Sequence, residues 1–230
     1  MITCELKRSH ITMTVQPRRI VFLAVGAVFL APGCDGKGRV DPNVSGLASA
    51  AVRADIEAVR RYVERGADVN ACEPKHGGTA LTAAVCGGSI EIVRYLLDHG
   101  ADPRKGWALI PAVRRRRIDL AGTLLAHGAD PNTPRAGGVP SSLTIAAENG
   151  DVAMLRVLIE HGVDLRAEGV PNPILAAVRG GHRDAVELLL AKGAANVNTK
   201  GPDGRRPLSI AESLGQRDIA SVLRKHGAVK

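Results

Sequence analysis

Apolar residues recur along most of the chain with the spacing of short amphipathic helices. Leu81–Val85 and Ile90–Asp98 each carry aliphatic residues at positions that fall on one helical face. Gly100 follows the second segment, and a glycine there is suited to the left-handed conformation in which helices often end. The pattern predicts two short helices joined by a turn.

This helix pair recurs six times in the same register. Six glycines that each follow a leucine-rich stretch are spaced 34, 28, 34, 31 and 34 residues apart. An alanine stands sixteen positions before every one of them, and a leucine or isoleucine stands nineteen positions before. Since one unit alone cannot bury its apolar face, the units are expected to stack into a solenoid. The glycines are Gly66, Gly100, Gly128, Gly162, Gly193 and Gly227, and the alanines are Ala50, Ala84, Ala112, Ala146, Ala177 and Ala211.

The loops and helix starts resemble the ankyrin repeat. GADVNA (66–71) and GADPN (128–132) open loops, while TALTAA (79–84) and NPILAA (172–177) open units. The TPLH histidine of the family is absent, the third loop is shortened, and Arg116 replaces the inter-helix glycine of the third unit. The resemblance implies an all-α solenoid of stacked helix-turn-helix units joined by β-turn or hairpin loops. The expected repeats are 46–70, 71–104, 105–132, 133–166, 167–198 and 199–229, and the first and last are expected to act as caps.

The N-terminal segment is predicted to be an export signal. Residues 20–31 are uninterrupted apolar, follow Arg18-Arg19 and precede a break at Pro32-Gly33. As a helix these residues would measure about 18 Å, too short for the roughly 30 Å hydrocarbon core of a membrane. We therefore expect a signal peptide over residues 1–33, with the true start at Met13.

Gly33-Cys34 resembles the lipobox of bacterial lipoproteins. The resemblance implies a lipid on Cys34, and Asp35 after it implies retention at the inner membrane, facing the periplasm. Residues 34–45 would then form a tether. The alternative is ordinary cleavage nearby, which leaves Cys34 a free thiol on a soluble periplasmic or secreted protein.

Composition and charge narrow the class of protein further. Hydrophobic residues make up 45% of the chain but aromatic residues only 2%, which argues against a β-sandwich and against an aromatic-lined cofactor pocket. The net charge is +8, and without residues 1–33 it is +5, from 27 Lys and Arg against 22 Asp and Glu. The mature chain is only mildly basic, so a nucleic-acid partner is not favoured.

Most candidate catalytic residues occupy positions that the repeat itself explains. His99, His127, His161 and His226 each precede a repeat glycine, where an imidazole caps the last helical turn. Asp55, Ser89 and Asp151 stand where the second helix of a unit needs an N-cap. Asp68, Asp102, Asp130 and Asp164 share one loop position and are predicted to be turn residues.

No other motif in the sequence points to catalysis. There is no phosphate-binding loop, no nucleophile motif and no Cys/His cluster with metal spacing. A bridge from Cys72 to Cys86 is not expected, because the helix between them spans about 9 Å and a disulfide needs Cα atoms within about 7 Å. We expect two free thiols, no metal, no cofactor, no small-molecule substrate and no enzymatic activity.

The candidate binding surface combines the loops with the ends of the first helices, where ankyrin repeats bind their partners. Arg114–Arg117 is the densest charge run in the chain. Trp107, the single tryptophan, replaces the usual threonine beside this run, so it is either an interaction hot spot or a filler for the shortened loop. The arginines either form a functional basic groove or merely solvate the surface. The predicted partner-binding residues are Arg53, Lys75, Arg104, Lys105, Trp107, Arg114, Arg115, Glu148, Asn149 and Arg179.

These features predict an exported protein that binds an acidic partner protein through a basic concave groove. Small exported bacterial ankyrin proteins resemble either immunity proteins that occlude a secreted effector or accessory proteins of periplasmic catalase. The alternative is a basic surface that binds anionic lipid or nucleic acid, which steep salt dependence without a protein partner would indicate.

Overall fold

A computed structural model describes residues 42–73, 78–133, 140–166, 172–193 and 197–229. The predicted signal peptide, Cys34 and Lys75 lie outside these residues. Within them the regular structure is twelve α-helices and a short 3-10 helix, with one isolated bridge between Glu73 and Gly78 and no strand. None of the described helices is both long and apolar enough to cross a membrane.

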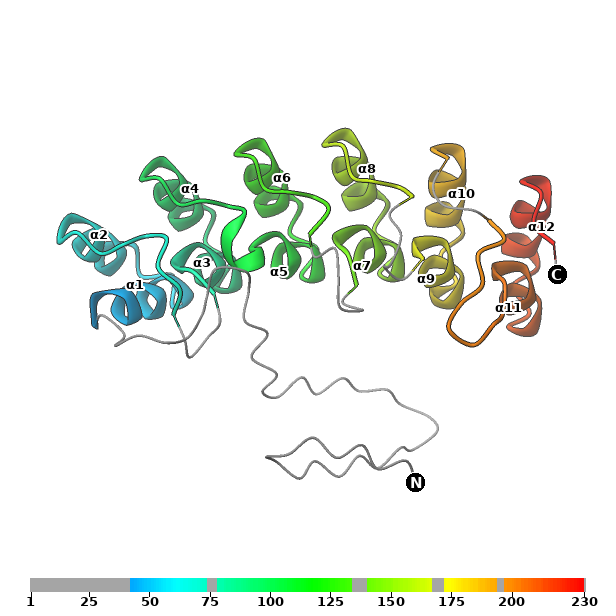
Figure 1. Cartoon of the computed structure of the whole chain (residues 1–230), viewed down its shortest axis with the longest axis horizontal. Helices are drawn as coiled ribbons and strands as arrows, with labels where there is room; N and C mark the ends of the chain where they lie inside the picture. Colours follow the sequence, from blue (N-terminus) through cyan, green and yellow to red (C-terminus); the bar gives the residue numbers. More distant parts are fainter. Residues whose placement is uncertain (1–41, 74–77, 134–139, 167–171, 194–196, 230) are drawn as a thin grey trace, which may run out of the picture.

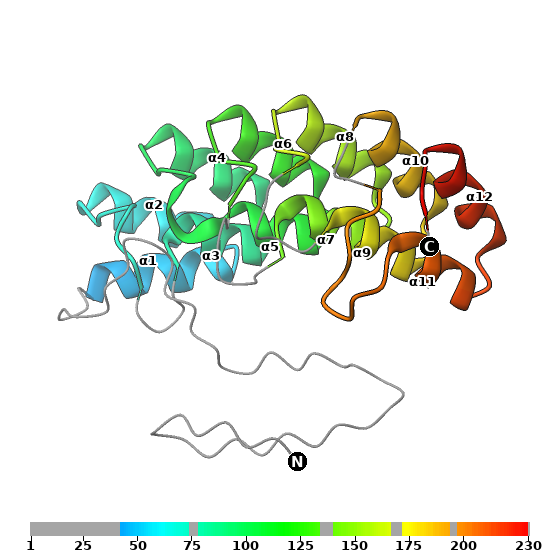
Figure 2. The ribbon, with the colours of Figure 1, turned by 45° about the vertical axis from the view of Figure 1, so that its right-hand side comes forward.

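The helices form six antiparallel pairs stacked in two layers (Figure 1). Each inner helix contacts the inner helices beside it, and each outer helix contacts its outer neighbours. Figure 2 shows both rows from a second direction, with the segment before α11 projecting beyond the inner layer. The inner helices are α1 (Pro42–Val52), α3 (Ala80–Gly87), α5 (Leu109–Arg114), α7 (Ser142–Glu148), α9 (Pro173–Gly180) and α11 (Pro207–Ser213). The outer helices are α2 (Ile56–Glu64), α4 (Ile90–Asp98), α6 (Ile118–Ala126), α8 (Val152–Glu160), α10 (Arg183–Ala191) and α12 (Arg217–Lys225), and η1 (Lys105–Trp107) precedes α5.

The repeat alanines lie in the buried core of the stack. All six alanines are fully buried, and the leucine or isoleucine three residues before each is buried too. The first repeat differs, because Tyr62 stands where the later repeats have a buried leucine. Its ring lies against Gly46, where a Cβ atom would collide with it. A glycine on α1 thus makes room for the larger side chain on α2.

The predicted N-caps of the outer helices are confirmed. The side chains of Asp55, Ser89 and Asp151 accept the backbone N–H of the residue three positions later. Thr79, Ser141 and Asn172 cap inner helices in the same way. The helices have six to eleven residues and are too short to be stable alone. The caps therefore help to define where each helix begins.

The turn inside each repeat also needs a left-handed residue, twelve positions before the repeat glycine. Four repeats place a glycine there, but the first has Ala54 at φ 58° and the third has Arg116 at φ 57°. A side chain in this conformation costs about 1–2 kcal/mol. These two turns are therefore strained by comparison with the others.

The last repeat ends the stack with polar side chains. Arg224 of α12 donates to Glu212 of α11, which pairs the two helices across the final unit. Arg205 donates to the Ser213 hydroxyl at 2.5 Å. At the other end α1 begins at Pro42, a residue suited to the first turn of a helix.

Candidate protein-binding surface

The C-terminal ends of the inner helices form one continuous row along the stack. This inner-helix row consists of Val52-Arg53, Cys86-Gly87, Arg114-Arg115, Glu148-Asn149, Arg179-Gly180 and Ser213-Leu214. Two of its junctions are very close. A Cβ atom on Gly87 would lie 2.7 Å from the carbonyl oxygen of Val52, and one on Gly180 would lie 3.0 Å from that of Glu148. Glycine at these positions lets neighbouring repeats meet backbone to backbone.

The arginine run at the end of α5 consists of two residues that bond neighbouring repeats and two that do not. Arg116 Nε donates to Asp151 Oδ2 at 3.2 Å, and Arg117 Nη1 donates to the Gly88 carbonyl at 3.1 Å. These two arginines therefore tie the third repeat to both of its neighbours. Arg114 and Arg115 are exposed, and no described residue forms an ion pair or side-chain hydrogen bond with them.

Arg117 also forms a two-point ion pair with Asp119 at 2.9 and 2.7 Å. These hydrogen bonds hold the pKa of the Asp119 carboxyl below its usual range. Its contribution to stability is therefore present above the ordinary aspartate pKa and is lost as the pH falls through the lowered value.

The other charged members of the inner-helix row differ in how they are partnered. Arg53 is exposed beyond the end of α1, and its guanidinium has no partner among the described residues. Arg179 Nη2 lies 3.3 Å from Asp203 Oδ2, on the loop before α11. The backbone N–H of Arg205 and the charge of Arg179 hold the pKa of Asp203 below its usual range. Glu148 is exposed and adds negative charge in the middle of the row.

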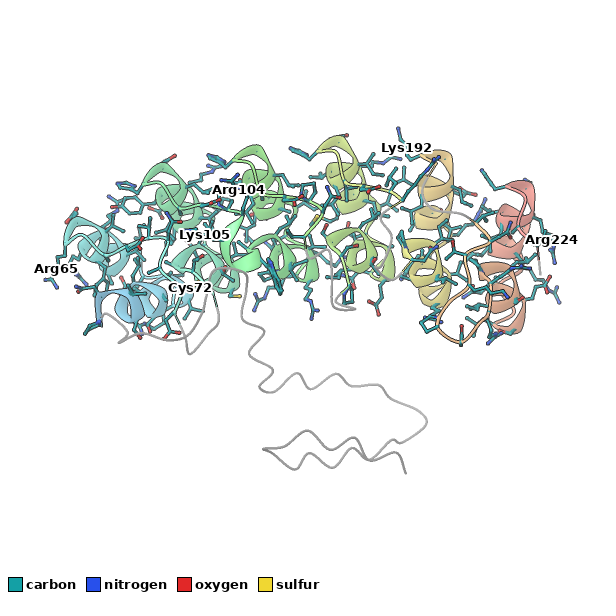
Figure 3. The ribbon with its side chains drawn as sticks, in the orientation of Figure 1. Arg65, Cys72, Arg104, Lys105, Lys192 and Arg224 are labelled. Atoms are coloured by element: carbon teal, nitrogen blue, oxygen red, sulfur yellow. The ribbon has the colours of Figure 1, made fainter. Side chains whose placement is uncertain are left out.

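Arg104 and Lys105 lie in the shortened loop between α4 and α5 (Figure 3). Both are exposed, but Arg104 is paired with Asp102 of its own turn at 3.1 Å. This hydrogen bond is the main cause that lowers the pKa of Asp102. Only Lys105 therefore brings an unpaired cation to this loop among the described residues.

Trp107 occupies the position at which other inner helices have a capping side chain. It is half-buried with φ 53°, directly after Gly106 at φ 70°, and α5 begins without a side-chain cap. The Thr82 hydroxyl donates to the Gly106 carbonyl at 3.0 Å and fixes the loop against α3. Trp107 is therefore largely covered, with a minor part of its surface exposed.

Asparagines link neighbouring loops, which sequence reasoning missed. Asn70 Oδ1 accepts the N–H of Asp102 at 2.7 Å, and Asn132 and Asn198 accept from the following loops in the same way. The GADVN motif carried this signal, because its asparagine recurs four or five residues after the repeat glycine. Arg104 and Arg166 stand at the equivalent position in the second and fourth repeats.

The histidines and aspartates of the repeat are confirmed as structural. Nδ1 of His99, His127, His161 and His226 lies 2.7–3.0 Å from the carbonyl oxygen four residues earlier, in position to donate to it. Asp68, Asp102, Asp130 and Asp164 each accept the N–H two residues later, as turn residues do. His182 Nε2 lies 2.9 Å from the Glu148 carbonyl and joins two repeats.

The prediction of two free thiols is wrong for one of them. Cys86 is a free thiol, as expected, but Cys72 forms a disulfide with a cysteine outside the described residues. Cys72 and Cys86 do not pair, as the helix between them predicts, but a cysteine elsewhere in the sequence is the partner of Cys72. No cluster of three His, Cys, Asp or Glu side chains suited to a metal ion occurs in the described part of the chain.

Stacked helical hairpins with glycine-ended helices and asparagine-linked loops define a solenoid of the kind that serves as a binding scaffold. A family model described as ankyrin repeats in three copies matches residues 47–135 and 143–230, and the chain belongs to this family. The fold is in general a non-enzymatic scaffold whose domains bind protein partners.

Relatives among curated proteins are diverse. The putative ankyrin repeat protein YahD of Escherichia coli is 30% identical over 192 residues, which cover 78% of this chain and 94% of YahD. The 2-5A-dependent ribonuclease of Mus musculus is 40% identical over 74 residues, or 32% of this chain and 10% of the ribonuclease. The chain spans a tenth or less of the length of several such relatives.

Solved structures show the same solenoid. An ankyrin repeat domain from Acinetobacter baumannii superposes with a TM-score of 0.69 at 28% identity, covering 80% of this chain and 98% of that domain. The ankyrin repeat domain of Bcl-3, a member of the IkappaB family, gives a TM-score of 0.65 at 26% identity, with 80% and 86% covered.

Proposed function

We propose that this chain is an exported ankyrin-repeat protein that binds an acidic partner protein through the basic part of its inner-helix row. The observation that carries this proposal is the exposure of Arg114 and Arg115, which have no partner among the described residues. Guanidinium groups suit carboxylates and steer the association of an oppositely charged surface. The neighbouring Arg116 and Arg117 bond adjacent repeats, so Arg114 and Arg115 are the members of the run that are left for a partner.

The biological role that fits is occlusion of an acidic secreted effector, as an immunity or inhibitor protein does, or support of an envelope enzyme. The chain itself acts as a binder and carries out no catalysis in this proposal. The repeat explains the histidines and aspartates that sequence analysis considered for chemistry.

The test is to isolate the chain from its native envelope after mild crosslinking and to identify co-purifying proteins by mass spectrometry. We expect one acidic protein in stoichiometric yield. Recovery of lipid or nucleic acid alone, with steep salt dependence, would support the alternative of a basic surface binder and overturn the proposal.

Charge reversal then tests whether the row is the binding surface. Replacing Arg53, Arg114, Arg115 and Arg179 by glutamate should abolish capture of the partner while the circular dichroism spectrum and the melting temperature stay close to wild type. Unchanged capture by this folded variant would show that the partner binds elsewhere.

The location we propose is the periplasmic face of the inner membrane, with a lipid anchor on Cys34. In a chain that has lost residues 1–33, a lipid on Cys34 and a disulfide at Cys72 exclude each other, because the remaining cysteine, Cys86, is free. Intact-mass measurement and thiol counting therefore distinguish the two forms, and a lipid on Cys34 would support the anchored location. A disulfide at Cys72 without lipid would favour the soluble secreted form.

A further inference from the structure

The unpaired positive charge of the inner-helix row is confined to the first three repeats. Arg53, Arg114 and Arg115 are exposed and have no partner among the described side chains. In the last three repeats Arg179 is paired with Asp203, and Arg224 with Glu212. Glu148 stands between the two halves and is exposed. Within the row, the arginines without a partner thus lie in repeats one to three, whereas Arg179 is paired with Asp203 and the Arg205 guanidinium bonds the Ser213 hydroxyl in the last repeat.

The same three repeats hold an exposed apolar surface between the arginines. Val52 is 46% exposed, and the other exposed large hydrophobic residues in the described part of the chain are Ile118, Leu214 and Val229, of which Leu214 belongs to the row in the last repeat. Its carbonyl oxygen faces Gly87 on α3. Because glycine has no side chain, none projects from the junction between α1 and α3 at this point. Cys86, next to Gly87, is half-buried. Val52, Cys86 and Gly87 form a small apolar patch. Arg53 lies at one end of this patch, and Arg114 and Arg115 lie at the other end.

The loop before α11 shows how a row arginine binds a carboxylate within this molecule. Gly201 N–H donates to the Arg205 carbonyl at 2.9 Å, which closes a tight turn around Asp203. The turn presents the carboxylate to Arg179 at the equivalent place in the row. Arg53, Arg114 and Arg115 are the same type of residue at the same helix ends, without such an internal carboxylate.

From this arrangement, and resting on the proposed function, we infer that repeats one to three bind an acidic segment of the partner that carries an apolar side chain between its carboxylates. Adjacent packed helices lie about 8–10 Å apart, so the row from α1 to α5 covers about 16–20 Å. An extended chain rises about 3.3 Å per residue and covers this length in five or six residues. The recognised segment therefore has acidic residues at both ends and an apolar residue near its middle.

The experiment uses two capped synthetic peptides of seven residues as probes. One has two glutamates at each end, serines inside them and a central leucine, and the other has serine in place of the leucine. Binding to the folded chain is followed by chemical shifts of the arginine Nε–H groups and of the backbone. We expect shifts at Arg53, Arg114 and Arg115 but not at Arg179, and about three- to tenfold weaker binding of the serine peptide, the range for partial burial of one leucine.

Matched variants separate specific recognition from general charge. The triple variant Arg53→Glu, Arg114→Glu, Arg115→Glu should lose peptide binding. The control Arg94→Glu, Arg156→Glu, Arg217→Glu changes the net charge equally at exposed sites on outer helices and should bind as wild type. Val52→Ser should remove the preference for leucine. Equal losses in both triple variants, no leucine preference, or no binding of either peptide would each overturn the inference.

These outcomes are distinguishable from failure of the proposed function. If the native partner is captured from the envelope but its binding depends on Arg179 and not on the first three repeats, the inference is wrong and the proposed function stands. If no protein partner is captured, the proposed function itself fails.

Discussion

At the scale of single residues, the chain departs from its own repeat where a non-glycine residue adopts a left-handed conformation. Ala54, Trp107 and Arg116 are the three such residues in the described part of the chain. Arg116 is compensated by its bond to Asp151, and Trp107 is held by the neighbouring loop contact of Gly106. Ala54 is exposed and gains nothing comparable from its methyl group.

Ala54→Gly is therefore expected to stabilise the protein. Glycine adopts φ near 58° without the steric cost of a Cβ atom, which outweighs its greater freedom in the unfolded chain. We expect a gain of about 0.5–1 kcal/mol in the free energy of unfolding, measured by urea denaturation. Ala153→Gly, at an exposed position inside α8, should have the opposite sign. A loss of stability in Ala54→Gly would contradict the strain at this turn.

At the scale of elements, caps and bonds between repeats compensate for very short helices. The N-cap of α8, Asp151, is nearly buried, and its carboxylate both accepts the Met154 N–H and binds Arg116 of the preceding repeat. The N-cap of α2, Asp55, accepts only the Ala58 N–H and is exposed. The N-cap of α8 should therefore contribute more to the free energy of unfolding than the N-cap of α2.

Asp151→Ala should destabilise the protein more than Asp55→Ala. Loss of an N-cap alone costs about 1 kcal/mol, and this is the expected effect at Asp55. At position 151 the loss of the Arg116 partner adds to it. Equilibrium unfolding in urea measures both variants, and equal losses would show that the bond between repeats contributes nothing.

At the scale of the whole molecule, stability depends on contacts between neighbouring repeats. Each helix pair packs on the pairs beside it, and α8 contacts both α6 and α10. Leu158 in α8 is completely buried at this position in the stack. A destabilising substitution at Leu158 should weaken the repeats on both sides, because each repeat of a solenoid is stabilised by packing against its neighbours.

Leu158→Asp should lower the melting temperature strongly, since a carboxylate would be buried without a partner at a cost of several kcal/mol. Amide hydrogen exchange should rise first in α6, α8 and α10. Ala153→Asp places the same side chain at an exposed position of α8 and should melt close to wild type. A Leu158→Asp protein that melts like wild type would show that the repeat register is wrong.

Much of the fold could be predicted from the sequence because each repeat encodes its own local structure. Six aligned alanines set the register of units that are buried in the stack, and Asp55, Ser89 and Asp151 predicted three helix starts. The histidines before the repeat glycines were recognised as caps for the same reason. Such features depend on residues a few positions apart, so spacing alone reveals them.

The candidate site was predictable only in part. The sequence located Arg53, Arg114, Arg115 and Arg179 in one register row but could not say which of them are paired. Whether Arg179 meets Asp203, or whether Cys72 forms a disulfide, depends on residues distant in the sequence that folding brings together. The sequence by itself determined the repeat, its register and the helix caps, because these are local. Only the tertiary structure decided which charges stay unpaired, because ion pairing depends on distances between repeats.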